Sequence, residues 1–174
     1  WGDLDPDACE LQAEGASVAP TLSSPAKAVL LQLIASHGWV LLLGDIRGVV
    51  SACSSRRTYT YFFEWIYPDF TAVLQRAAIV YHAVPAVSTP LLKLYGELVY
   101  NKAQRLTFDS SSPNGILLFR DMSAVIVAYG SRILERHVPA GADAYAHRFK
   151  GISICMTVFA RALSGNYVNF GVFA

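Results

Sequence analysis

Histidines are the first side chains to consider for metal binding or acid–base chemistry. The four are His37, His82, His137 and His147, and none of them falls in an HExxH motif or pairs with another at i, i+4 spacing. A zinc-type site needs at least three converging ligands, and this spacing gathers no such set. We interpret all four as surface or packing residues and expect neither a bound metal nor a cofactor.

The cysteines are Cys9, Cys53 and Cys155, which are odd in number, far apart and free of any CxxC pair. This pattern indicates free thiols in a reducing compartment, where most cysteines serve as small core residues.

Catalytic motifs are missing elsewhere in the sequence. The serines in Gly130-Ser131 and Ser164-Gly165 lack the GxSxG context of a nucleophile elbow, and Arg120-Asp121 lacks the histidine and downstream asparagine of a kinase loop. No GxxxxGK[ST] or GxGxxG phosphate-binding sequence occurs. We therefore expect that the protein is not an enzyme.

A basic and aromatic run begins at Arg56 and Arg57 and continues through Tyr59, Tyr61, Phe62 and Phe63. Such a run can form a nucleic-acid patch, but the formal net charge of +1 gives no general attraction to nucleic acid. We interpret the run as a helix with a basic first turn, with Phe63, Trp65 and Tyr67 in the core, and expect no nucleic-acid partner.

Residues 28–44 carry no formal charge and approach the length of a membrane-spanning helix. Polar residues and a glycine interrupt the middle of this segment, at Gln32, Ser36, His37 and Gly38. We interpret it as a buried helical hairpin bent at His37-Gly38 and expect no membrane insertion. A membrane-associated helix is the less favoured alternative.

Composition and hydrophobic spacing predict an all-α fold. Of 174 residues, 53% are hydrophobic and 16% charged, a balance that excludes a disordered chain. Residues 1–24 have the composition of a linker. From Ser24 onward, apolar segments of about 12 to 20 residues favour helices over strands. The expected helices are 25–36, 40–53, 56–67, 69–82, 90–102, 114–134 and 145–164, of which the first two could be one helix kinked at Gly38.

Proline after a hydroxyl residue marks three expected helix starts, namely Ser24-Pro25, Thr89-Pro90 and Ser112-Pro113. Asn114 and Asp69 are further candidate caps. Three stripes at helical spacing predict the buried faces: Leu91, Leu94, Leu98 and Lys102; Leu118, Met122, Val125, Tyr129 and Ile133; and Ile152, Cys155, Met156, Phe159, Ala160 and Leu163. Successive helices with short connections stack as antiparallel pairs in a bundle or a solenoid.

Several long blocks of this sequence resemble the middle region of the exportin-7 and Ran-binding protein group of the importin-β superfamily. They are DIRGVVSACSSRRTYTYFFEWIYP (45–68), TPLLKLYGELVYNKAQRLTFDSSSPNGILLFRD (89–121), AYGSRIL (128–134) and KGISICMTVFARALSGNYVNFGVF (150–173). The sequence of these blocks is most similar to the plant or algal branch of the family. Residues 1–23 resemble nothing in the family, and SHGWVLLL (36–43) replaces a more polar run.

This resemblance implies a segment of a nuclear export receptor built as a superhelix of HEAT repeats. Family members bind the GTP form of the small GTPase Ran together with cargo, pass the nucleoporins of the pore, and shuttle between nucleus and cytoplasm without catalysis. Residues 25–174 are then HEAT-like helix pairs truncated at the C-terminus, and the principal Ran-recognising repeats are expected outside them. A helical-repeat scaffold without Ran dependence is the alternative.

The residues nominated for partner contacts are the polar positions that we expect to be exposed, namely Arg56, Arg57, Arg105 and Asp109. The loop from Ala103 to Ser112 is long for a helix–helix connection, and we expect Leu106 and Phe108 to anchor it on the neighbouring helices.

Overall fold

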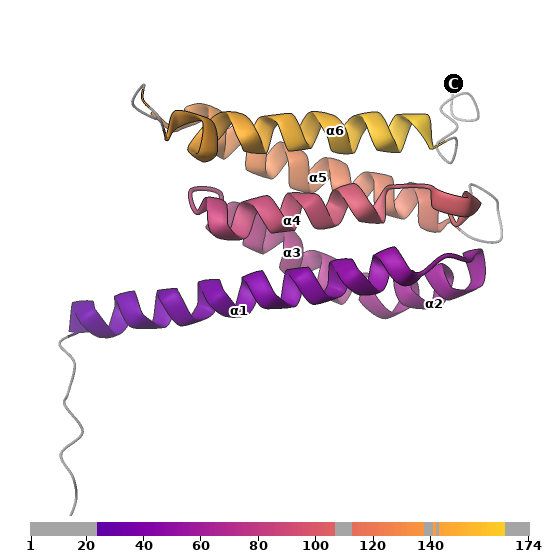
Figure 1. Ribbon diagram of the computed structural model, residues 1–174, viewed down its shortest axis with the longest axis horizontal. Coiled ribbons are helices and arrows are strands. Elements are labelled where there is room, and N and C mark those ends of the chain that lie inside the picture. Colours follow the sequence, from indigo (N-terminus) through magenta and orange to yellow (C-terminus); the bar gives the residue numbers. More distant parts are fainter. Residues whose placement is uncertain (1–23, 107–112, 138–140, 142, 166–174) are drawn as a thin grey trace, which may run out of the picture. The chain divides into compact units, whose positions relative to one another are not determined.

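The computed structural model describes residues 24–106, 113–137, 141 and 143–165 (Figure 1). Within these residues every regular element is helical and no strand occurs, which confirms the all-α prediction. The longer helices are α1 (Ser24–Ala52), α2 (Arg56–Ile66), α3 (Asp69–Val80), α4 (Pro85–Leu98), α5 (Asn114–Glu135) and α6 (Lys150–Ser164). A short 3₁₀ turn, η1 (Lys102–Gln104), follows α4, and a π-helical turn, η2 (Tyr145–Phe149), leads into α6.

The chain divides into two units, residues 1–33 and residues 34–174. The described part of the first unit is the start of α1, on which Val29 and Leu33 are exposed. The packing of helices concerns the second unit.

The helices of the second unit alternate in direction between two layers. In Figure 1, α1, α4 and α6 run the same way, and α5 returns in the opposite direction behind them. Helix α4 packs against α6, and α3 packs against α5. Alternate helices thus stack within the same layer, as in an α-solenoid.

The predicted stripes of α4 and α5 both form the core. Leu91, Leu94 and Leu98 are buried, and so are all five residues of the stripe from Leu118 to Ile133. Lys102, the fourth residue of the first stripe, is exposed in η1 beyond the end of α4. Regular 3.6-residue spacing of large apolar side chains therefore identified these faces correctly.

The predicted stripe of α6 is wrong for Met156, Ala160 and Leu163, which are exposed, whereas Cys155 is buried and Ile152 and Phe159 are partly buried against the core. The buried positions of α6 are Gly151, Cys155, Val158 and Ala162. Met156 and Leu163, which we expected in the core, are more than half exposed. The cause is close packing, because small side chains bring α6 near its neighbours. A Cβ atom at Gly151 would lie 1.9 Å from the hydroxyl of Tyr129 on α5.

The start of α4 is displaced, whereas α3 and α5 begin at the expected residues without the expected caps. Helix α4 begins at Pro85 and contains Pro90, because burial of Val87 and Ser88 in the preceding turn outweighs the cost of an internal proline. Helix α3 begins at Asp69 with Pro68 before it, so Asp69 supplies a negative charge to the first turn and is not the cap. Helix α5 begins at Asn114 with no side-chain cap, and Ser112 lies outside the described residues.

Helix α1 contradicts the expected buried hairpin. It continues unbroken through His37 and Gly38, and most of its described apolar side chains are exposed, while Leu43, Ile46 and Val50 are buried. Its segment Gln32–Ala52 is long and apolar enough to cross a membrane by length and composition. One helix of this kind is weak evidence for a membrane span, because core helices and signal sequences satisfy the same criterion.

Candidate partner-binding surface

The nominated residues Arg56 and Arg57 occupy the first turn of α2 and are exposed, as expected. The helix begins with a capping box, in which the Ser55 hydroxyl accepts a hydrogen bond from the Thr58 amide and Thr58 Oγ1 accepts one from the Ser55 amide. Positive charges at a helix N-terminus oppose the helix dipole, at about 0.3–1 kcal/mol each. The two arginines therefore do not stabilise α2 through its dipole, and both lie on its exposed first turn.

A row of large side chains continues from Arg57 along the exposed face of α2. Tyr61 is 59% exposed and Trp65 is 70% exposed, at successive i, i+4 positions. The Arg57 guanidinium carbon lies 5.7 Å from the centre of the Tyr61 ring, a cation–π contact. We call Arg57, Tyr61 and Trp65 the α2 stripe.

The opposite face of α2 anchors the helix in the core through Tyr59, Phe62, Phe63 and Ile66. The predicted burial of Phe63 is confirmed, whereas the prediction that Trp65 is a core residue is wrong. Its ring lies 5.9 Å from that of Phe62, at the border of the core. Arginine, tyrosine and tryptophan are the residue types that most often dominate binding energy at protein interfaces, so the α2 stripe has the composition of a contact site.

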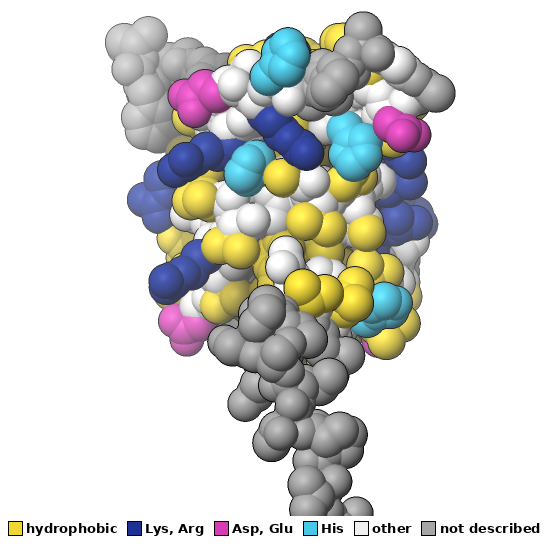
Figure 2. Space-filling model, turned by 90° about the vertical axis from the view of Figure 1, so that its left-hand side faces the viewer, with side chains coloured by type: hydrophobic (Ala, Val, Ile, Leu, Met, Phe, Trp, Pro, Cys, Tyr) yellow, Lys and Arg dark blue, Asp and Glu magenta, His cyan; other side chains and the backbone are white. Residues whose placement is uncertain are grey.

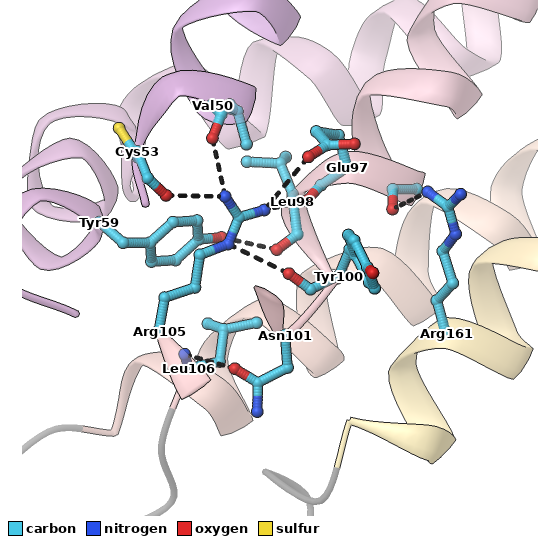
Figure 3. Close-up of polar contacts among 11 residues, drawn as sticks. Val50, Cys53, Tyr59, Glu97, Leu98, Tyr100, Asn101, Arg105, Leu106 and Arg161 are labelled. Atoms are coloured by element: carbon cyan, nitrogen blue, oxygen red, sulfur yellow. Dashed lines mark hydrogen bonds and ion pairs between the residues drawn. The ribbon is translucent and has the colours of Figure 1, made fainter. Parts of the chain in front are cut away.

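The third nominated residue, Arg105, is not at the surface. Its side chain is 0% exposed, which contradicts the expectation that it is exposed. Figure 3 shows its guanidinium among main-chain carbonyl oxygens from two helix ends. Nη1 donates to the carbonyls of Val50 at 2.7 Å and Cys53 at 3.0 Å, at the end of α1. Nη2 donates to Glu97 at 2.6 Å and Nε to Tyr100 at 3.1 Å, at the end of α4.

The physical reason for burying Arg105 is that the last carbonyls of a helix have no partner within that helix. The five-donor guanidinium satisfies carbonyls of α1 and α4 together. Its charge is balanced by the Glu97 carboxylate at 3.5 Å and by the Tyr59 ring, whose centre lies 4.7 Å away. Arg105 therefore joins three helices from inside.

The same edge of the layer continues to α6. Asn101 Nδ2 donates to the Gly165 carbonyl at 2.6 Å, and Arg161 Nη1 donates to the Gly96 carbonyl at 2.9 Å. The Arg161 guanidinium also lies over the Tyr100 ring, 5.1 Å from its centre (Figure 3). We call the Arg105, Asn101 and Arg161 contacts the C-terminal linkage, because they join the C-terminal ends of α1, α4 and α6.

The fourth nominated residue, Asp109, and the proposed anchor Phe108 lie outside the described residues. Leu106, the other proposed anchor of this loop, is buried as expected. Its amide donates to Asn101 Oδ1 at 2.8 Å, which fixes the described start of the loop to the C-terminal linkage.

The described residues contain no group of three or more potential metal ligands. Figure 2 shows histidine side chains on one face, separated from each other by hydrophobic and other side chains. Both cysteines of the described part, Cys53 and Cys155, are free. Burial raises the pKa of the Cys155 thiol to about 11, so this thiol is not an activated nucleophile.

Comparison with known proteins adds what the geometry alone does not supply. No protein-family profile matches the chain. Exportin-7-B of Xenopus laevis is 50% identical over 139 residues, which is 80% of this chain and 13% of that protein. The chain is homologous to part of exportin-7.

Other relatives support this assignment. Ran-binding protein 17 of Mus musculus is 49% identical over 76% of the chain and 12% of its own length. Exportin-7 of Dictyostelium discoideum is 46% identical over 76% of the chain and 13% of its own length. These identities confirm the predicted resemblance. The chain spans about one eighth of the length of each of these relatives. No solved structure matches the chain.

The homology also places the helical architecture in context. Exportins are HEAT-repeat proteins, and the two-layer packing of α3 on α5 and of α4 on α6 agrees with a fragment of such an array. The names of the relatives support a family of nuclear export receptors that bind Ran.

Proposed function

We propose that this chain forms part of a nuclear export receptor that carries cargo together with Ran in its GTP form and performs no catalysis. The observation that supports the proposal most strongly is the 50% identity to exportin-7-B over 80% of the chain. Such a receptor moves between nucleus and cytoplasm and contacts nucleoporins during passage. A solenoid of stacked helices suits this task because it offers an extended surface for partners.

Within the receptor, we propose that Arg56 and the α2 stripe contact a protein partner. Exposed arginine and aromatic side chains in one row supply both charge and a large apolar area. Arg105 has a different role in this proposal, since its guanidinium is fully used inside the fold.

The test replaces the matched 139-residue segment of Xenopus exportin-7-B with the corresponding residues of this chain. The chimeric receptor is incubated with Ran locked in its GTP or GDP form in the presence of a nuclear extract. Capture of the GTP form alone, with cargo enriched beside it, is the expected result. Equal or absent capture of both forms, while the unmodified receptor still distinguishes them, would leave only a helical scaffold without Ran dependence.

The role of the α2 stripe is tested in the same chimera. The double variant Arg57→Ala/Trp65→Ala is expected to lower the capture of cargo or Ran at least tenfold. The matched control is Arg132→Ala/Tyr145→Ala, which removes another exposed arginine and another exposed aromatic residue from α5 and η2. Equal capture by both double variants would contradict the assignment of the stripe.

A further inference from the structure

A pocket of about 300 Å³ opens between α3, α5 and the turn that joins α2 to α3. Ala72 and Ala124 lie on its two helical walls, and Tyr67 and Arg120 also line it. Gln75 and Asp121 supply its polar groups. Because α3 and α5 already pack against each other, this pocket lies between neighbouring helices of one layer and not on an unpartnered outer helix.

Asp121 is the unusual member of this pocket, because a carboxylate seldom lies only 4% exposed without a charged partner. Its Oδ1 accepts a hydrogen bond from Gln75 Nε2 on α3, and its Oδ2 accepts one from the Tyr95 hydroxyl on α4 at 2.6 Å. Both donors are neutral side chains. They orient the carboxylate but do not balance its negative charge.

No lysine, arginine or histidine in the described part of the chain forms an ion pair with Asp121. The neighbouring Arg120 donates instead to the Tyr67 hydroxyl, at 2.6 Å. Each carboxylate oxygen of Asp121 has one further acceptor position, since a carboxylate can accept about four hydrogen bonds in all. A buried charge of this kind is costly unless a cation pairs with it.

We infer that this pocket receives the lysine side chain of a bound protein segment, with the lysine ammonium paired to Asp121. The α-carbon of the lysine would lie at the mouth, beside Arg120 and Tyr67, and its methylene stem would pass between Ala72 and Ala124. The small side chains at these two positions leave the necessary room.

Lysine suits the pocket better than arginine. A guanidinium pairs best with both oxygens of a carboxylate at once. Gln75 and Tyr95 already occupy one acceptor position on each carboxylate oxygen of Asp121. A planar guanidinium that must contact both oxygens at once therefore has little room to approach. A compact ammonium can pair through a single oxygen. This inference does not rest on Ran or on the export function. If the lysine site is disproved, the proposed export function remains testable, and the reverse also holds.

The experiment measures binding of Nα-acetyl-lysine N-methylamide to the chain by ligand-observed saturation-transfer NMR at micromolar protein. We expect saturable binding with a millimolar Kd for the lysine probe. The Nε-acetylated probe, which has no charge, is expected to bind at least tenfold more weakly, and so is the arginine counterpart. Equal signals from the lysine and acetylated probes would overturn the inference, and equal signals from the arginine probe would overturn the choice of lysine.

Three variants locate the site. Asp121→Asn removes the charge with little change of shape, and Ala124→Leu fills the pocket from an exposed position without altering Asp121, Gln75 or Tyr95. Both are expected to abolish saturable lysine binding. Glu135→Gln removes an exposed carboxylate near the far end of α5 and is the matched control, with unchanged binding expected. Retained binding in Ala124→Leu would overturn the inference even if Asp121→Asn failed to fold.

Discussion

Arg105 shows how one charged residue can bind several main-chain carbonyls at once. It donates to four carbonyl oxygens and lies beside one carboxylate and one aromatic ring. A hydrogen bond from a charged donor contributes about 1.5–3 kcal/mol to stability. The residue is therefore a centre of stability, although arginine is ordinarily a surface residue.

We predict that Arg105→Met lowers the free energy of unfolding by about 3 kcal/mol or more, because four hydrogen bonds from a charged donor are lost together. Arg105→Lys keeps the charge but cannot supply the planar fork, and we expect it to recover only part of this loss. Urea denaturation followed by circular dichroism measures both. Arg57→Met is the matched control and should change stability by less than about 1 kcal/mol. Equal effects at positions 57 and 105 would contradict the role of Arg105.

Cys155 and Cys53 differ in chemical reactivity because their surroundings differ. Cys155 is buried on α6 with its pKa raised to about 11, whereas Cys53 is half-buried after α1. Only the thiolate is nucleophilic. We predict that iodoacetamide at pH 8 modifies Cys53 faster than Cys155 by at least tenfold in the folded protein.

Peptide mapping by mass spectrometry distinguishes the two cysteines, and addition of urea should make their rates similar. A Cys155 that reacts as fast as Cys53 without urea would show that α6 opens readily.

At the scale of the helices, Gly151 sets how closely α6 approaches α5. A Cβ atom at this position would lie 1.9 Å from the Tyr129 hydroxyl and 2.8 Å from the ring carbon that carries it. Contacts below 3.0 Å force a structural shift. Glycine at this position therefore allows α6 to approach Tyr129 on α5.

We predict that Gly151→Ala destabilises the fold by about 1–3 kcal/mol through overpacking, despite the higher helix propensity of alanine. Combining it with Tyr129→Phe removes the closest atom and should restore part of the stability. Thermal unfolding of the two single variants and the double variant measures the coupling between them. Strictly additive losses would indicate that the two residues do not meet.

The sequence predicted the elements better than it predicted their exact faces. Large apolar residues at helical spacing identified α5 and the buried leucines of α4. On α6 the same reasoning favoured Met156 and Leu163, because hydrophobicity alone does not show that Gly151 and Ala162 allow closer packing. Trp65 was assigned to the core for the same reason.

Arg105 could not have been placed from the sequence. The two residues before it, Ala103 and Gln104, both have φ of 53°. This left-handed conformation is uncommon for residues other than glycine, and it reverses the chain after α4. No sequence signal marks this reversal, and without it Arg105 looks like any arginine in a polar loop. In the sequence, Asp121 likewise stands out only as part of an incomplete kinase motif.

At the scale of the whole molecule, three buried acids share one direction of pKa shift. Burial raises the pKa of the Tyr95 hydroxyl, reinforced by the Asp121 carboxylate, and burial also raises the pKa values of Tyr129 and Cys155. Above the pKa values of the unfolded chain, the unfolded state loses protons that the folded state retains. The folded state then binds more protons, and stability falls as the pH rises.

We predict that the free energy of unfolding decreases between pH 8.5 and pH 10.5, by up to about 1.4 kcal/mol per pH unit for each group that titrates. Urea denaturation at successive pH values measures the slope. Cys155→Ala removes one of the three groups, so its slope should be shallower, although its stability at pH 7.5 starts lower. A stability that is constant or rises over this range would contradict the prediction.

The C-terminal linkage has a mechanical consequence. Arg105, Asn101 and Arg161 form side-chain hydrogen bonds that join three helices of one layer at the same end, from α1 to α4 and from α4 to α6. These hydrogen bonds must stretch or break if the helices separate at that end. We therefore expect this end of the layer to be stiffer than the opposite end. A change in the curvature of the layer would then alter the spacing of the helices mainly at the opposite end, which lacks the C-terminal linkage. We expect bending that separates these helix ends to be resisted more strongly than bending that separates the opposite ends.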